Sequence, residues 1–365
     1  MRQRPDLRLH LSTRRRSATC QRRSQAPGRH RVTRRAVQGR RPALAAVACA
    51  AVLATCLSPV GAAPAGAASV GAPIMFGAVG NSRKTVDAHE RVLGRTLRGL
   101  RVYKNWDQHL FGGTQTWARD TGHTLFMSID SRRSNGSAVK WADVASARPG
   151  SRLYDEMLSQ ANQIKKFGAQ VFIAYNHEPD AQRSNDKGSP AQFVAAWRKV
   201  VSVYRAAGAT NAKFAWVMTA YSFRRKQGAG AGSYYPGDSY VDDIGADGYN
   251  WYQCRGGGGG WSAMSTIFEG QREFGLKHPS KGLMIWEFSS AEDPKSPGRK
   301  ARWFNDVERL FQTTPWNQYS AVLTWEGRAS VHKLSCQFDY LSSRSATAAW
   351  KALGTDPAFT AVRVH

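Results

Sequence analysis

The chain has 365 residues, a formal net charge of +26 at pH 7 and a hydrophobic fraction of 42%. Fourteen Arg and one Asp in residues 1–41 supply +13 of that charge, so the remainder of the chain is also basic. The basic residues accompany no nucleic-acid-binding motif, which argues against nucleic acid as a partner. Weak attraction to anionic cell-wall polymers or polysaccharides accounts for the charge equally well.

Residues 1–67 have the features of a basic leader and secretory signal peptide. The basic region is followed by the Ala-rich apolar run 42–60 and then by Ala65-Gly66-Ala67, a small-x-small cleavage site. The apolar run is too short and too rich in Ala for a good membrane span. We therefore expect a secreted protein with no membrane span, whose folded part is residues 68–365.

One domain is the expected organisation of this folded part. Its length and the twelve Trp of the chain are enough to bury one large core, and no repeat or linker sets off a second module. Two cysteines remain after the leader, Cys254 and Cys336, and an even pair in an oxidising compartment predicts a disulfide. We expect the protein to be a monomer.

Short apolar runs alternate with amphipathic segments from residue 73 onward. Ser189-Pro190 predicts the start of one helix and Gly208 its end, and residues 298–313 predict another. Residues 227–240 are rich in Gly, Ser, Tyr and Pro, so a loop is expected where a helix should follow the fifth strand. Strands separated by helices form a parallel sheet, and eight of them predict an α/β fold, the closed (β/α)8 TIM barrel. The predicted strands are Pro73–Val79, Gly99–Trp106, Thr124–Ile129, Gln170–Tyr175, Lys213–Thr219, Val241–Tyr249, Gly282–Trp286 and Tyr319–Trp325.

Two of these strands deliver a glutamate. Residues 171–175 run into His177-Glu178, and residues 283–286 run into Glu287. Because the carboxyl ends of barrel strands face one shared pocket, strands four and seven would bring the two carboxylates together. Glycoside hydrolysis needs one carboxyl group as proton donor and a second as nucleophile or base. The pair therefore predicts a glycosidase.

Polar and aromatic residues at other strand ends complete the candidate site. Tyr249 would hydrogen-bond the nucleophile, with Asp247 in support, and Trp325 is the candidate floor for the apolar face of a sugar. Each of them can equally be a packed structural residue, and Glu326 is a rival for the second carboxylate. No spaced His/Asp/Glu set indicates a metal, and the run 256–260 lacks the Lys-Ser/Thr of a phosphate loop. Further candidates for substrate binding are His177, Asn176, Trp106, Trp251 and Trp286.

These motifs resemble glycoside hydrolase family 26, the β-mannanase family of barrel enzymes with a catalytic Glu on strands four and seven. The likeness covers residues 73–354 and rests on His177-Glu178, on the segment 235–249 and on Glu287 within Trp-Glu-Phe. The resemblance implies a retaining double displacement with Glu178 as acid/base and Glu287 as nucleophile, without a metal or organic cofactor. It also implies that His177, Tyr249 and Trp325 orient the catalytic groups and hold the sugar.

The flanks of His177-Glu178 depart from the family pattern. Mannanases of this family usually carry an Arg a few residues earlier, where this chain has Ile-Ala-Tyr-Asn at 173–176. An endo-β-1,4-mannanase is accordingly the leading expectation, with a polysaccharide as the partner. The alternatives are a β-glucanase or β-xylanase of the same family, and a carbohydrate-binding barrel without catalytic activity.

Overall fold

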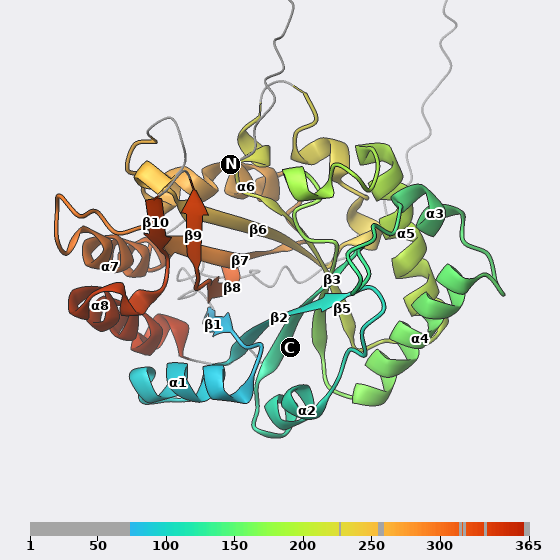
Figure 1. Ribbon diagram of the computed structural model, residues 1–365, viewed down its shortest axis with the longest axis horizontal. Helices are drawn as coiled ribbons and strands as arrows, with labels where there is room; N and C mark the ends of the chain where they lie inside the picture. The colour runs from blue at the N-terminus through green and yellow to red at the C-terminus, as the bar shows by residue number, and fades with distance from the viewer. Residues whose placement is uncertain are drawn as a thin grey trace, which may run out of the picture. The chain divides into compact units, whose positions relative to one another are not determined.

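The computed structural model describes residues 74–225, 228–254, 259–313, 316, 319–331 and 334–360. Within these ranges, strands β1 to β8 follow one another around a closed barrel in which β8 pairs in parallel with β1. Helices surround the barrel (Figure 1). The predicted (β/α)8 barrel is therefore confirmed. The predicted leader, residues 1–67, lies outside the described residues.

Each of the predicted strands is present, within a few residues of its expected bounds. Parallel strands that are covered on both faces read as nearly continuous apolar runs, and β4, with the sequence VFIAY, is buried throughout. The strands are β1 (Met75–Val79), β2 (Gly99–Asn105), β3 (Thr124–Asp130), β4 (Val171–Tyr175), β5 (Ala212–Thr219), β6 (Asp243–Asn250), β7 (Gly282–Ser290) and β8 (Tyr319–Thr324).

Local sequence signals set the bounds of the helix after β4. Helix α5 (Pro190–Ala206) begins with a capping box, in which Ser189 and Gln192 satisfy each other's backbone N–H groups. It ends just before Gly208, whose φ of 77° lies in the left-handed region that glycine tolerates best. The other α-helices are α1 (Arg83–Leu93), α2 (Gly113–Asp120), α3 (Trp141–Ser146), α4 (Arg152–Phe167), α6 (Met264–Leu276), α7 (Arg299–Phe311) and α8 (Arg344–Thr355).

Two further predictions from the sequence are confirmed between β5 and β8. The helix expected over 298–313 is α7, and it buries an apolar face that includes Trp303, Phe304 and Val307. The described part of 227–240 forms only short 3-10 turns, η3 (Ala231–Tyr234) and η4 (Asp238–Tyr240); Gln227 lies outside the described residues. Nowhere in the described ranges is a helix both long and apolar enough to cross a membrane.

The core has two layers, as the barrel requires. The outer layer packs the helices against the outward-facing side chains of the strands. The inner layer fills the barrel, where the rings of Phe126 and Phe172 stack 4.8 Å apart and Trp286 meets Phe126 edge-on. Because the interior is filled, a ligand has access only to the ends of the barrel.

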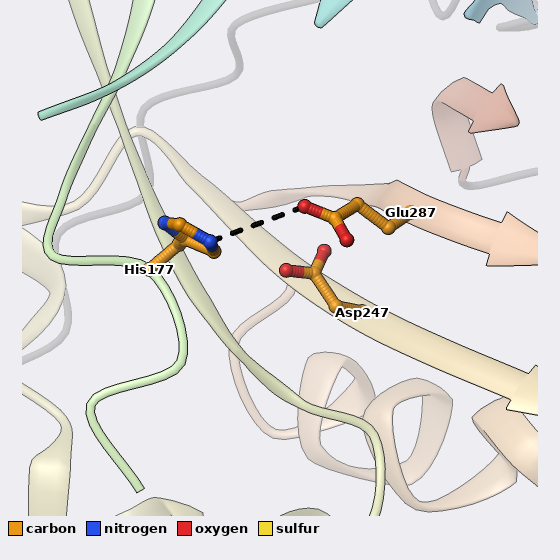
Figure 2. A group of neighbouring side chains, drawn as sticks. All are labelled: His177, Asp247 and Glu287. Atoms are coloured by element: carbon orange, nitrogen blue, oxygen red, sulfur yellow. Dashed lines mark ion pairs between the residues drawn. The ribbon is translucent and has the colours of Figure 1, made fainter. Parts of the chain in front are cut away.

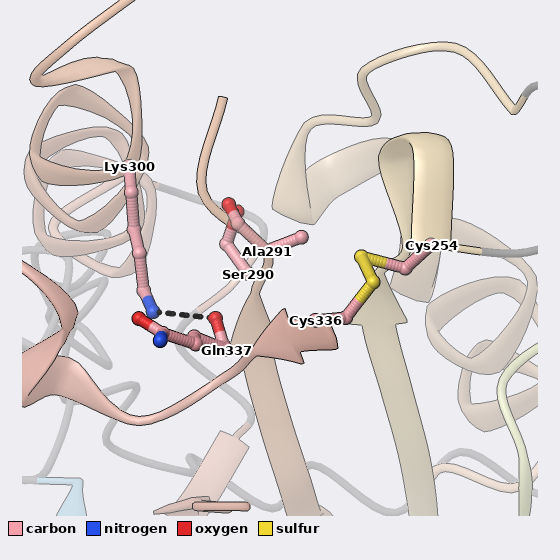
Figure 3. Close-up of a disulfide and its surroundings, with 6 residues drawn as sticks. All are labelled: Cys254, Ser290, Ala291, Lys300, Cys336 and Gln337. Atoms are coloured by element: carbon pink, nitrogen blue, oxygen red, sulfur yellow. Dashed lines mark hydrogen bonds between the residues drawn. A yellow bond between two sulfur atoms is a disulfide. The ribbon is translucent and has the colours of Figure 1, made fainter. Parts of the chain in front are cut away.

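A hairpin after β8 carries the second cysteine. Strands β9 (Arg328–Val331) and β10 (Leu334–Gln337) pair antiparallel, which was not predicted from the sequence. The predicted disulfide between Cys254 and Cys336 is present, with a Cα–Cα distance of 5.6 Å (Figure 3). Next to it, Lys300 of α7 donates to the carbonyl oxygens of Gln337 and Asp339, at 3.2 and 2.6 Å. The disulfide thus ties the segment after β6 to the hairpin after β8.

Candidate active site

A cavity of about 560 Å³ opens at the carboxyl ends of the strands. The two glutamates predicted to form the catalytic pair, Glu178 and Glu287, both line it. Five of the predicted substrate-binding residues accompany them, and the barrel gathers these from three separate parts of the sequence. They are His177, Asp247, Tyr249, Trp251 and Trp325.

The end of β4 presents two consecutive side chains to this cavity. In a regular strand His177 and Glu178 would point to opposite faces, yet both line the cavity. The alternation breaks because Asn176 and Glu178 adopt positive φ angles of 45° and 49°. Non-glycine residues seldom take this conformation, which costs about 1–3 kcal/mol and is concentrated at functional sites. Backbone strain at β4 therefore directs both groups toward the ligand.

On β7, a β-bulge directs the side chain of Glu287 to the cavity. Ala246 pairs with Ile285 and Asp247 pairs with Glu287, so Trp286 is an extra residue relative to β6. Consequently Trp286 enters the filled barrel interior while its neighbour Glu287 lines the cavity above it. Bulges next to active sites commonly re-aim a side chain in this way.

The Glu287 carboxylate accepts hydrogen bonds on both oxygens. Oε1 accepts from the Tyr103 hydroxyl at 2.8 Å and from Nη2 of Arg101 at 3.0 Å. Oε2 accepts from the Tyr249 hydroxyl, as the sequence predicted for this tyrosine. Hydrogen bonds to a carboxylate favour its ionised form and fix its orientation. Glu287 is therefore held in a fixed orientation facing the cavity.

Glu178 has the opposite environment. Burial, followed by the negative charge of Glu287, raises the pKa of Glu178 to about 7, although Arg183 acts in the other direction. Nη2 of Arg183 lies 3.2 Å from Oε2 of Glu178. A carboxyl group with a pKa near neutrality can hold a proton and release it during a reaction. The two glutamates thus differ in the way that an acid and a nucleophile must differ.

Asp247 is a third carboxyl group in the same cavity. Its side chain is buried, and neither of its oxygens has a hydrogen-bond partner among the described residues. Burial, together with the charges of Glu287 and Glu178, raises the pKa of Asp247 well above its usual range. A neutral, unpartnered carboxyl group lining a cavity is suited to hydrogen-bond a sugar hydroxyl.

His177, Asp247 and Glu287 lie close enough to be tested as a metal site. One potential ligand atom from each lies within 4.8 Å of the others, and Nε2 of His177 is 4.0 Å from Oε1 of Glu287 (Figure 2). However, Arg183 donates a hydrogen bond to His177 Nε2, and Arg101 donates one to Glu287. A divalent cation would face both guanidinium groups, so the donor set does not suit a metal.

Aromatic side chains form part of the cavity wall. The ring of Tyr249 lies 5.6 Å from that of Trp325 and 5.3 Å from that of Trp251, and both contacts are edge-on. These rings pack against the disulfide of Cys254 and Cys336. Aromatic faces at a cavity wall provide the apolar surface on which sugar rings stack.

The structure does not bring every predicted residue into the cavity. Trp106 is buried elsewhere and donates from Nε1 to Glu156 at 2.7 Å. Asn176 is buried as well, and it accepts a hydrogen bond from Lys187 at 2.7 Å. Trp286 fills the barrel interior. Glu326, the rival carboxylate, lies 3.3 Å from Nδ1 of His89, and the cavity lining does not include it.

Three residues that contact the glutamates were missed in the sequence. Arg101 and Tyr103 lie on β2 and contact Glu287, while Arg183 follows β4 in the 3-10 turn η1 (Gln182–Ser184) and contacts Glu178. The available signal was Arg101 itself, a charged residue within the apolar stretch Leu100-Arg-Val102. The loop containing residues 255–258, which includes part of the run 256–260, lies outside the described residues, whereas Gly259 and Gly260 line the cavity.

Comparison with known proteins identifies one relative by sequence and several solved structures of similar fold. No family model matches the chain. The chain is 24% identical over 278 residues to endoglucanase H of Acetivibrio thermocellus, an alignment that covers 72% of this chain. It spans only 28% of the length of that relative.

Solved structures of similar fold include several family 26 enzymes. The GH26 domain of an endo-β-mannanase/endo-β-glucanase from Prevotella bryantii has a TM-score of 0.55 at 14% identity, covering 79% of this chain and 90% of that chain. A GH26 β-mannanase from Bacteroides ovatus has a TM-score of 0.54 at 16% identity, covering 78% and 89%. A modular endo-β-1,4-mannanase from Cellulomonas fimi has a TM-score of 0.53 at 16% identity, covering 78% and 71%. The resemblance to family 26 is thereby confirmed at the level of the fold.

Proposed function

We propose that the protein is a secreted, retaining glycoside hydrolase of the family 26 type that cleaves a β-linked polysaccharide. The observation that carries this proposal is the contrast between two glutamates in one cavity. Glu287 accepts hydrogen bonds from Arg101, Tyr103 and Tyr249, whereas the pKa of Glu178 is raised to about 7 by burial and by the charge of Glu287. One is prepared as an anion and the other as a proton donor.

The reaction would proceed in two displacements. In the first, the Glu287 carboxylate attacks the anomeric carbon while the bond to the leaving oxygen breaks, and Glu178 gives its proton to that oxygen. In the second, Glu178 removes a proton from a water molecule, which attacks the same carbon and releases Glu287. Glu178 is protonated again at the end, so the cycle closes without a metal or another cofactor.

The substrate of this reaction is proposed from the relatives and from the cavity wall. Mannan is the leading backbone, because the solved structures of similar fold include β-mannanases. A β-glucan is the second candidate, because the sequence relative is an endoglucanase and one of the structural neighbours acts on both kinds of backbone. Trp325, Trp251 and Tyr249 would supply the stacking surface for either.

Secretion and a monomeric state belong to the same proposal. The disulfide between Cys254 and Cys336 suits an oxidising compartment, and an external polysaccharide is too large to cross a membrane before it is cleaved. The leader with the features of a signal peptide supports this location.

Digestion of a glycan panel tests the proposal. Mature protein is incubated with mannans, mixed-linkage glucans and xylans, and released reducing ends are counted and sized. Glu287→Gln should lower turnover by at least about 10⁴-fold, as expected for removal of a nucleophile. Glu326→Gln is the matched control. Glu326 follows the neighbouring strand β8 but does not line the cavity, so this variant should retain turnover. Binding to a glycan without any product would instead identify a carbohydrate-binding barrel.

A further inference from the structure

Arg101 lies inside the barrel, directly beneath the candidate active site. It projects from β2 and is fully buried, with 0% of its side chain exposed. Its guanidinium lies between two rings, 4.2 Å from the centre of Tyr103 and 4.9 Å from that of Trp286. Nη1 donates to the carbonyl oxygen of Val102 at 3.3 Å, and Nη2 donates to Glu287. Since Arg101 does not line the cavity, it acts on a substrate only through Glu287.

Burying a cation costs free energy unless an anion accompanies it. The carboxyl group that pairs with Arg101 is therefore the one expected to carry the negative charge. The cavity contains three carboxyl groups, Glu178, Asp247 and Glu287, and Arg101 donates to only one of them. Glu178 is paired with the half-exposed Arg183, and the Asp247 oxygens lack hydrogen-bond partners. The buried guanidinium of Arg101 is therefore aimed at Glu287.

We propose that Arg101 is a positioning residue that assigns the negative charge of the cavity to Glu287. This inference rests on the proposed hydrolase function and deepens it. With the guanidinium in place, Glu287 is the anion while Asp247 and Glu178 remain protonated. Without it, the two protons would be shared among three carboxyl groups whose charges interact through space. The charged and titratable groups that face Glu287 are Arg101 and Tyr103 from β2, His177 and Glu178 after β4, and Asp247 and Tyr249 from β6.

The same contact has a consequence for the second displacement. When the glycosyl–Glu287 ester is hydrolysed, the carbon–oxygen bond to Glu287 breaks and its electron pair returns to the carboxylate. Arg101 stabilises the charge that reappears, because the guanidinium is fixed before the reaction and is shielded from water. Loss of Arg101 should therefore slow release of the enzyme from the intermediate and narrow the pH range of activity.

The pH dependence of kcat/KM separates this role from a merely structural one. The substrate is the glycan that wild-type protein cleaves in the panel, together with the dinitrophenyl β-glycoside of the same sugar. Arg101→Met should move the acidic limb of the profile at least about one pH unit upward, since an opposite charge at this distance shifts a carboxyl titration by that amount or more. Arg101→Lys keeps the charge and should keep the limb near its wild-type position. The Met variant should also show a burst of dinitrophenol, as the glycosyl-enzyme accumulates.

Unfolding measurements provide a readout that does not depend on activity. Arg101→Met leaves Glu287 as an unpaired buried charge, so adding Glu287→Gln to that variant should restore stability, whereas Glu287→Gln alone should lower it. The two changes would then be strongly non-additive. Additive effects, together with an unmoved acidic limb in a folded Arg101→Met protein, would overturn the inference. A wild-type protein that cleaves no glycan would instead overturn the proposed function, while the unfolding cycle would still report on the Arg101–Glu287 charge pair.

Discussion

Arg183 contacts both residues that the end of β4 presents to the cavity, donating to His177 Nε2 and lying 3.2 Å from Oε2 of Glu178. One half-exposed cation is thus shared by the proposed proton donor and its neighbour. Since Arg183 lowers the pKa of Glu178 against the larger raising effect of burial, its removal should let that pKa rise above about 7.

The sign of this change follows from the role of the acid. Glu178 must be protonated to act, so activity is lost as pH rises through its pKa. Arg183→Gln should accordingly extend activity to higher pH, by an amount that shrinks with added salt because the arginine is 46% exposed. Profiles of kcat/KM against pH measure the shift. Arg309→Gln, which removes an exposed arginine paired with Asp306 on α7, is the control; an alkaline limb that moves downward in Arg183→Gln would contradict the assignment of Glu178 as acid.

The two tyrosines that donate to Glu287 should differ in importance. Tyr249 is the donor to Oε2 among the described residues, while Oε1 receives hydrogen bonds from both Tyr103 and Arg101. A hydrogen bond to a charged group contributes about 1.5–3 kcal/mol, or about 10- to 150-fold in rate. Tyr249→Phe should lower kcat within that range, and Tyr103→Phe should lower it less. The reverse order would show that the orientation of Glu287 depends mainly on Oε1.

Trp325 should contribute to binding more than to chemistry. Trp325→Ala removes an apolar contact of about 1.5 kcal/mol or more, so KM should rise about tenfold while kcat changes little. Trp106→Phe is the control, because the indole of Trp106 is buried outside the cavity and donates a hydrogen bond to Glu156. It should lower the thermal midpoint and leave KM unchanged. Kinetics on the preferred glycan distinguish the two, and an unchanged KM in Trp325→Ala would exclude it as the sugar platform.

The disulfide should stabilise the barrel and the aromatic wall together. Cys254 and Cys336 are 82 positions apart, and cross-linking a loop of that size contributes about 4 kcal/mol by restricting the unfolded chain. The double variant with Ser at both positions should lose about that much in guanidinium unfolding. Because the wall of the cavity packs against the disulfide, KM should also rise. Wild-type protein treated with dithiothreitol should unfold at the same midpoint as the variant; a higher midpoint would mean that the serines perturb the fold themselves.

Prediction from the sequence succeeded where a pattern repeats along the chain. Apolar runs of strand length and amphipathic helices between them are periodic, and they were sufficient for the barrel and for the strands that carry Glu178 and Glu287. The same rule failed for Trp106 and Trp286, because a tryptophan at a strand end has no signal that separates a buried ring from a cavity wall. Only the three-dimensional packing decides between the two.

Local departures from regular geometry account for the features of the site that could not be predicted from the sequence. The positive φ angles at Asn176 and Glu178 break the alternation that placed His177 on the far face, and neither residue type requires such a conformation. Arg101 was missed because a buried charge on a strand becomes intelligible only beside its partner, Glu287, which is 186 residues away. Sites of this kind violate local rules, so sequence reasoning is least reliable there.

The extra residue in β7 fixes the height of Glu287 along the barrel axis. If β7 paired with β6 one residue for one, Trp286 would stand opposite Asp247 and Glu287 opposite Gly248, one residue step or about 3.3 Å further along the barrel and on its outer face. The bulge brings Glu287 back to the level of Asp247 and onto the inner face, where its Oε1 lies 2.8 Å from the hydroxyl of Tyr103. The depth at which the Glu287 carboxylate would meet a sugar ring is thus encoded by one additional residue in a single strand.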